Sequence, residues 1–194
     1  MNNTNVTPEL KDLVRLVEQF SAVISKFPEV KYAGDPVLRQ GVQRVTVEEG
    51  VSIGKRLGET LLRYRKEVGF GRGFAAPQIG ESKAVFVSFV DDTLQIFINP
   101  KITERSTKTN FYRELCLSSG IMAADTERSS WIVMQWLDES DEEHTERFDG
   151  FLARLYQHEE SHLRGKLNLD EATEGGIEFA TFDPLQEQIR DSRG

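Results

Sequence analysis

The segment His158-Glu159-Glu160-Ser161-His162 limits the possible folds of this chain more than any other feature. It is an HExxH motif, and two histidines four residues apart converge on one metal ion when they lie on a helix. Phe151 and Leu155 precede them at helical steps, so the imidazoles continue an apolar stripe that should face the core. Glu159 projects beside the metal, where it can exchange a proton with metal-bound water. The motif therefore predicts a buried helix that carries a catalytic metal site.

Chance also produces such motifs, and the two histidines would then be ordinary core residues beside surface glutamates. The chain contains only three histidines, and two of them lie in the motif, so a metal site is the favoured interpretation. The third, His144, is expected on the surface in a strand or a turn.

A catalytic metal site needs a third protein ligand and an open coordination position. Cys116 is one candidate because thiolates bind zinc and iron strongly, although a lone cysteine is more often a small buried hydrophobe. A downstream carboxylate is the other candidate, as in thermolysin-like zincins: Glu171, Glu174 or Glu178. The HExxH motif does not choose between them.

Residue periodicity predicts an α+β fold in which two helices precede several strands and a last helix. Apolar residues at helical spacing predict three helices, at 8–27, at 48–68 and from 150 to about 164. Two β-rich runs, 84–90 and 94–98, predict a hairpin that ends at Asn99-Pro100. A further strand at 131–137 is expected to pair with 144–148.

The chain is expected to have three parts: an N-terminal helical extension (1–29), a catalytic domain (30–170) and an acidic C-terminal tail (171–194). Within the domain, residues 69–80 contain too many glycines for a helix interior and are predicted to form a structured loop.

The charge and the apolar runs of the chain narrow its partners and its location. A formal net charge of −8 and a pI near 5.0 argue against general nucleic-acid binding and against docking on anionic membranes. A single cysteine allows no intrachain disulfide. No apolar run approaches the ~20 residues of a membrane span, and no signal peptide is apparent, so the cytoplasm is the expected location.

Three segments resemble the motifs of the peptide deformylase family. Residues 71–80 (GRGFAAPQIG) resemble the family motif GxGxAAxQ, residues 114–118 (ELCLS) resemble EGCLS, and residues 157–165 (QHEESHLRG) resemble QHExDHLxG. Their order and spacing match the family, and weaker matches extend the resemblance over about residues 30–170. The combination is highly specific, although each piece is not.

The resemblance implies a fold in which small antiparallel β-sheets pack around a central metal-binding helix. It implies removal of the formyl group from N-formylmethionyl peptides, with N-formylated nascent chains at the ribosome as partners. It implies Fe²⁺ as the usual metal, with Zn²⁺, Ni²⁺ or Co²⁺ as substitutes. The resemblance assigns no role to the N-terminal helix.

The resemblance also assigns roles to individual residues. Cys116, His158 and His162 would bind the metal, and Glu159 would act as general base and then as general acid. The side-chain amide of Gln78 and the backbone N–H of Leu117 would stabilise the oxyanion. The substrate would be bound by residues of the first two motifs: Gly71, Arg72, Gly73, Glu114 and Leu115.

Four positions depart from the family motifs. Leu115 replaces a glycine and could narrow the substrate cleft, and Arg72 places a guanidinium where an aliphatic side chain would contact methionine. Ser161 replaces an aspartate and removes a charge near the metal, and Ser119-Gly120 replaces an aliphatic residue and a proline. These changes leave open a divergent relative that binds peptides with altered or no activity. A zincin protease that uses a downstream glutamate as the third ligand is a further alternative with less support.

Overall fold

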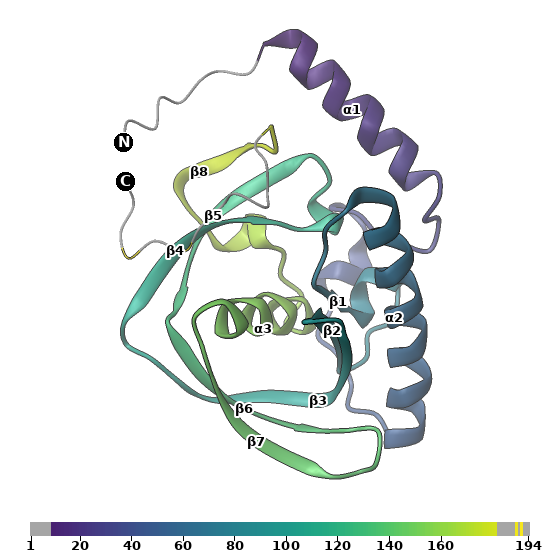
Figure 1. Ribbon diagram of the computed structural model, residues 1–194, viewed down its shortest axis with the longest axis vertical. Helices are drawn as coiled ribbons and strands as arrows, with labels where there is room; N and C mark the ends of the chain where they lie inside the picture. Colours follow the sequence, from purple (N-terminus) through teal and green to yellow (C-terminus); the bar gives the residue numbers. More distant parts are fainter. Residues whose placement is uncertain (1–8, 182–188, 190, 192–194) are drawn as a thin grey trace.

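Two antiparallel sheets surround helix α3 (Gly150–Leu163) in the computed structural model, which describes residues 9–181, 189 and 191 (Figure 1). Helices α1 (Leu10–Ile24) and α2 (Val47–Val68) lie to one side of them. The described residues contain eight strands: β1 (Gly73–Ala75), β2 (Val85–Val90), β3 (Thr93–Arg105), β4 (Thr109–Leu115), β5 (Met122–Ser129), β6 (Trp131–Leu137), β7 (Glu143–Asp149) and β8 (Ala172–Phe179). Four short 3₁₀ helices complete the described elements: η1 (Pro36–Arg39), η2 (Ala76–Ile79), η3 (Leu117–Ser119) and η4 (Asn168–Glu171). The predicted α+β class is confirmed.

The five-stranded sheet has the order β1-β2-β3-β6-β7, and the three-stranded sheet has the order β4-β5-β8. The predicted β2–β3 hairpin is present, but its predicted end at Asn99-Pro100 is wrong, because β3 continues to Arg105. A register shift between Ile98 and Lys101 accommodates the proline, which cannot donate to the ladder. Oδ1 of Asn99 accepts a hydrogen bond from the backbone N–H of Val45 at 2.9 Å, and Nδ2 donates to the carbonyl of Val45 at 2.8 Å. These two bonds stabilise the irregular backbone.

The three-stranded sheet was not predicted. Its strands β4 and β5 contain buried polar residues such as Asn110, Glu114 and Arg128, so no alternation of apolar and polar residues reveals them. The predicted acidic tail is also corrected in part, because β8 lies beyond the expected boundary at residue 170 and pairs with β5. Most of the remaining tail, from residue 182, lies outside the described residues.

Helix α2 matches its prediction closely. The hydroxyl of Thr46 accepts a hydrogen bond from the N–H of Glu49 at 3.2 Å, and Gly69 ends the helix in the left-handed conformation. A stripe of three glycines, Gly50, Gly54 and Gly58, faces Ile98, Ile96 and Leu94 of β3 in turn. A Cβ atom at any of these glycines would overlap the facing side chain, so the stripe lets α2 pack directly on the sheet.

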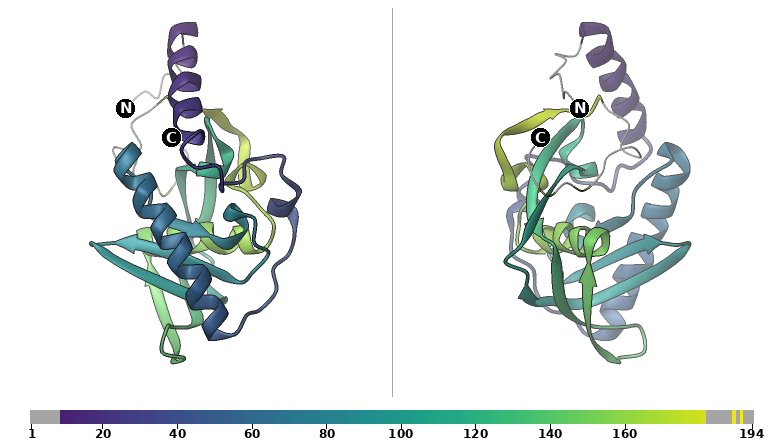
Figure 2. Two further views of the ribbon diagram at one scale, coloured as in Figure 1. Left: turned by 90° about the vertical axis from the view of Figure 1, so that its right-hand side faces the viewer. Right: turned by 60° about the vertical axis from the view of Figure 1, so that its left-hand side comes forward.

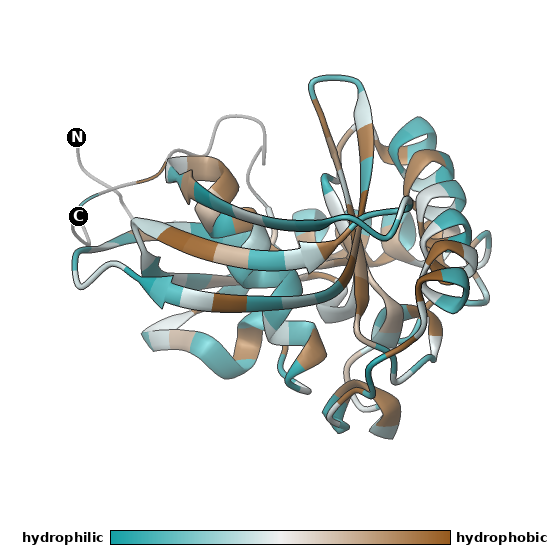
Figure 3. Cartoon of the chain, turned by 90° about the horizontal axis from the view of Figure 1, so that it is seen from below, coloured by the Kyte–Doolittle hydropathy of each residue, from teal (hydrophilic) through white to brown (hydrophobic). Residues whose placement is uncertain are grey.

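Two apolar clusters form the core. One lies between α2 and the β1–β3 part of the sheet, and the other lies between α3 and the opposite face around Phe86, Phe97 and Trp136. Helices and strands accordingly carry hydrophobic segments interrupted by hydrophilic ones (Figure 3). Helix α1 contributes no buried residue and projects from one end of the protein (Figure 2). Among the described residues, no helix has the length and apolar character needed to cross a membrane.

Candidate metal centre and active site

The three predicted metal ligands meet at one point between the two sheets. Cys116 follows the end of β4, and His158 and His162 lie one turn apart on α3. Sγ of Cys116 lies 3.4 Å from Nε2 of His162, and one donor atom from each of the three residues lies within 4.8 Å of the others. Tetrahedral zinc with Zn–S of about 2.3 Å and Zn–N of about 2.0 Å separates sulfur from nitrogen by about 3.5 Å. The donor set therefore fits a metal with three protein ligands.

The downstream glutamates, which were the alternative candidates for the third ligand, do not lie among the grouped donor atoms. Glu171 forms an ion pair with Arg128 at 3.0 Å, and Glu178 forms one with Arg113 on β4. Glu174 lies exposed on β8. The grouping of donor atoms therefore favours the thiolate of Cys116 over a zincin-like carboxylate.

Glu159 lies on α3 between the two histidines, and its side chain is buried with 2 % exposure. Its Oε2 has no hydrogen-bond partner within the described part of the chain. Burial raises the pKa of this carboxyl from its ordinary value of 4.5 to about 7. Gly73 leaves room for it, since a Cβ atom there would overlap Oε1 of Glu159. A carboxyl with a free oxygen and a pKa near neutrality is suited to exchange protons beside the metal.

Gln78 directs its amide donors toward the metal ligands. Its Oε1 accepts a hydrogen bond from the N–H of Ala75 at 2.9 Å, which fixes the orientation of the amide. Its Nε2 then lies 3.2 Å from Oγ of Ser118 and 3.6 Å from Sγ of Cys116. Leu117 is the first residue of η3, where a backbone N–H has no partner within the helix. Both groups lie next to Cys116, as an oxyanion site requires.

Glu114 borders the cavity beside the metal ligands, but its carboxylate is engaged by other side chains of the protein. We expected it to bind substrate, but its side chain is 4 % exposed and bonds three cationic or imidazole groups. Oε2 accepts from Nδ1 of His158 at 2.8 Å, and both oxygens accept from Arg128, at 2.6 and 2.8 Å. Arg154 donates to Oε1 at 2.7 Å. The carboxylate therefore orients His158 so that Nε2 faces the metal position.

Two buried arginines, Arg128 and Arg154, belong to the site although the sequence analysis did not predict them there. Burial raises the pKa of Glu114, but the charge of Arg128 and its hydrogen bonds, together with His158, lower it well below the ordinary value. Burial lowers the pKa of Arg128, but Glu114 and Glu171 raise it overall. Arg154 also bonds the carbonyl of Asn110 at 2.7 Å. Arg128 therefore lies between two carboxylates, and Arg154 shares Glu114 with it.

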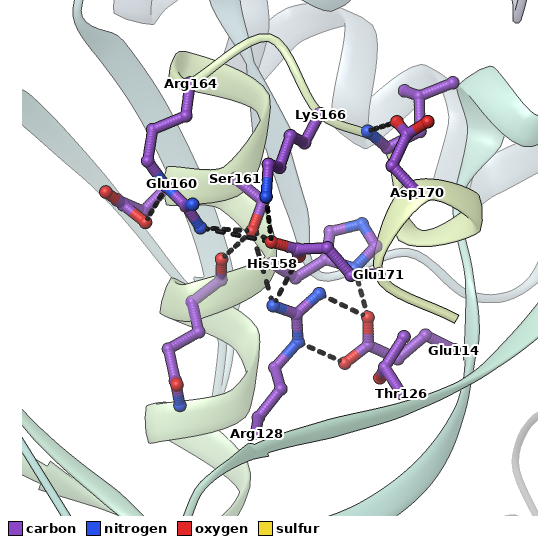
Figure 4. A network of polar contacts seen from close by, with 12 residues as sticks. Glu114, Thr126, Arg128, His158, Glu160, Ser161, Arg164, Lys166, Asp170 and Glu171 are labelled. Carbon is purple, nitrogen blue, oxygen red and sulfur yellow. Dashed lines mark hydrogen bonds and ion pairs between the residues drawn. The ribbon is translucent and has the colours of Figure 1, made fainter. Parts of the chain in front are cut away.

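The expected loss of charge at Ser161 is compensated by Glu171 (Figure 4). Oγ of Ser161 lies 2.7 Å from Oε2 of Glu171, and Nη1 of Arg128 donates to the same oxygen at 3.0 Å. Burial raises the pKa of Glu171, but Arg128 and Ser161 lower it overall. A carboxylate from η4 thus reaches Arg128 next to the position where an aspartate at 161 would stand.

A cavity of about 690 Å³ opens onto Cys116, His158 and Glu159. Leu115 lines it but stays in register with Ala123 of β5, so the leucine does not displace the backbone of β4. Arg72 also lines it, with its guanidinium 4.8 Å from the ring centroid of Phe151. Both departures from the family motif therefore lie in the cleft wall, outside the group of metal ligands.

Comparison with known proteins agrees with this geometry. A family model described as polypeptide deformylase matches residues 28–176. The peptide deformylase of Pseudothermotoga lettingae is 38% identical over 168 residues, which cover 85% of this chain and 94% of the relative. That of Treponema pallidum is 37% identical over 75% of this chain and 88% of the relative.

Solved structures show the same fold. The crystal structure of peptide deformylase from Thermotoga maritima has a TM-score of 0.67 and 34% identity, covering 74% of this chain and 96% of that one. The structure from Synechococcus elongatus in complex with actinonin has a TM-score of 0.66 and 32% identity, covering 74% and 78%.

Proposed function

Because the chain belongs to the polypeptide deformylase family, a family of metal-dependent hydrolases, we propose that it removes the formyl group from N-formylmethionyl peptides. One observation carries the proposal. The donor atoms of Cys116, His158 and His162, the free carboxylate oxygen of Glu159 and the amide of Gln78 all converge beside one cleft. Hydrolysis of an amide needs this combination of activated water, a proton carrier and oxyanion donors.

Cys116, His158 and His162 would bind the metal through Sγ and two imidazole nitrogens. A divalent metal bound there supplies Lewis acidity, which lowers the pKa of a coordinated water from ~15.7 toward ~7. We propose Fe²⁺ as the native ion, and Zn²⁺, Ni²⁺ or Co²⁺ fit the same donors. The carboxylate of Glu114 accepts a hydrogen bond from Nδ1–H of His158, which keeps this imidazole in the tautomer that leaves Nε2 free for the metal.

Glu159 would take the proton of the attacking water and return it to the leaving amine. Its pKa near 7 favours both steps, since a group that is half protonated near neutral pH can accept and donate. Gln78 and the N–H of Leu117 would donate to the oxyanion, and one such donor is worth about 3–4 kcal/mol of barrier. The glycines at 71 and 73 would let an extended peptide approach the strand edge closely.

The test is release of formate by protein that is purified and assayed without oxygen. We expect metal-dependent release from formyl-Met-Ala and none from acetyl-Met-Ala. Glu159→Gln is the matched control, because it keeps the three ligands and replaces the proton carrier. Absence of formate release from protein shown to contain one metal per chain would refute the proposal.

The native metal is tested separately by elemental analysis of the protein purified without oxygen. Iron in near-equimolar amount, and loss of activity on exposure to air that Zn²⁺ or Ni²⁺ addition prevents, would support the assignment of Fe²⁺. Zinc as the dominant ion in that preparation would contradict it.

A further inference from the structure

Helix α1 forms one wall of the cleft that contains the predicted metal ligands. The residues that line the cavity of about 690 Å³ include Cys116 and His158 as well as Leu16, Phe20 and Val23 of α1. These three residues follow one another at steps of four and three, so they lie on one face of the helix. The same space therefore connects the reaction site with an apolar helix face.

Contacts near the metal site fix the C-terminal half of α1. The ring of Phe20 meets Tyr32 edge to face, with centroids 5.4 Å apart. It also lies on Gly120, where a Cβ atom would be 3.0 Å from Cζ of Phe20. Gly120 follows η3, which begins directly after Cys116. The N–H of Ala33 bonds the carbonyl of Ser118 in η3 at 2.7 Å, so the chain after α1 is attached to the same turn.

Helix α1 takes little part in the core, because Val23 alone of its residues packs against an apolar core cluster. None of its residues is buried, and Leu16, Phe20 and Val23 remain partly exposed on the cleft. The match to the family model starts at residue 28, so α1 lies outside the matched residues. Figure 2 shows it projecting beyond the sheets. An apolar helix face that stays partly exposed on a cleft is typical of a binding surface.

The cleft is too large for the formylated residue alone. A volume of about 690 Å³ lies in the range of sites that enclose a whole drug-sized ligand, which exceeds one methionine residue. The other lining residues include the aromatic side chains of Tyr64, Phe70 and Phe74, and Tyr64 meets Phe70 edge to face with ring centroids 6.2 Å apart. The space between the walls suits apolar side chains of the residues that follow the formylated one.

We propose that α1 determines specificity by binding apolar side chains of the peptide downstream of its formylated residue, with Phe20 and Leu16 as the principal contacts. The inference rests on the proposed deformylase function and adds a preference that the catalytic residues do not provide. Partial burial of one large apolar side chain against each of these residues corresponds to about a tenfold gain in affinity.

The test compares kcat/KM for a two-residue and a four-residue substrate, formyl-Met-Ala and formyl-Met-Ala-Leu-Leu. The readout is the ratio of the long to the short peptide. Phe20→Ala and Leu16→Ala should each lower this ratio about tenfold, mainly through a higher KM for the long peptide. Val17→Ala is the matched control, because Val17 lies on α1, is 51% exposed and does not line the cavity. It should leave the ratio unchanged, and thermal unfolding checks that each variant is folded.

The outcomes separate this inference from the function on which it rests. A wild-type protein that releases no formate from formyl-Met-Ala refutes the proposed function. If the wild type is active but the ratio is the same in Phe20→Ala and Leu16→Ala, α1 does not bind the peptide and the inference is wrong. An equal loss on both peptides also leaves the ratio unchanged and overturns the inference, because it assigns α1 a structural role. A lower ratio in both variants but not in Val17→Ala supports it.

Discussion

Replacing Glu171 by glutamine tests whether this residue supplies the carboxylate that Ser161 lacks. Its side chain is 18% exposed and that of Arg128 is 5% exposed, so their ion pair is largely shielded from water. A hydrogen bond to a charged group contributes about 1.5–3 kcal/mol, and Glu114 still neutralises Arg128 in the variant. We expect Glu171→Gln to lower the free energy of unfolding by about 2 kcal/mol at pH 7. For a protein of this size, that lowers Tm by about 4–8 °C.

The second half of the test adds Ser161→Asp. In the wild type the new carboxylate would meet Glu171, whose Oε2 lies 2.7 Å from Oγ of Ser161, so the substitution should destabilise the protein. In Glu171→Gln the same aspartate would meet Arg128 instead and should restore part of the lost stability. The effect of one substitution thus changes sign between two backgrounds, and a double-mutant cycle measures the coupling.

Thermal unfolding of the four metal-loaded proteins measures these effects, with Glu143→Gln on the exposed edge of β7 as the matched control. The folded pKa of Glu171 lies below its ordinary value of 4.5. Its contribution is therefore complete above that value and is lost as the pH falls through the folded pKa, so the variant should approach the wild type in acid. A Tm of Glu171→Gln equal to that of the control, or an effect of Ser161→Asp with the same sign in both backgrounds, would refute the reasoning.

Three further substitutions test the site. Glu159→Gln should keep the metal and lower kcat for formate release by about 10²–10⁴-fold, and a small loss would mean that another group carries the proton. Cys116→Ala should weaken metal binding at least about 100-fold by elemental analysis, whereas retained metal with peptidase activity would favour a glutamate ligand. Gly73→Ala should displace the carboxylate of Glu159, cost about 1–3 kcal/mol of stability and lower activity. Gly41→Ala is its control, since a Cβ atom there meets nothing within 4 Å, and equal behaviour of the two variants would contradict the close fit at Gly73.

Local patterns in the sequence predicted the parts of the fold that local forces determine. Helix α2 has both a capping threonine and a terminal glycine, and strands β2, β3 and β6 are rich in apolar and β-branched residues. The ligands on α3 follow from the spacing of four residues between His158 and His162. These signals are short-range, so they can be read from neighbouring residues without knowledge of the tertiary structure.

The sheet of β4, β5 and β8 could not be predicted in this way. Glu114 and Arg128 are hydrophilic residues on neighbouring strands, and their burial depends on the ion pair between them and on partners from α3 and η4. The partnership of Ser161 with Glu171 depends on the turn after α3 and on η4, which returns the chain to the helix. Such pairs arise from tertiary contacts, so the residue pattern within a single segment does not predict them.

The glycine stripe of α2 has a consequence for how the protein folds. Each glycine within a helix costs about 1 kcal/mol relative to alanine, so Gly50, Gly54 and Gly58 together weaken the isolated helix by about 3 kcal/mol. The helix regains that free energy only when it lies against Leu94, Ile96 and Ile98 of β3. Formation of α2 and of the β2–β3 hairpin is therefore coupled in one cooperative unit, and hydrogen exchange in α2 should become as slow as that in β3.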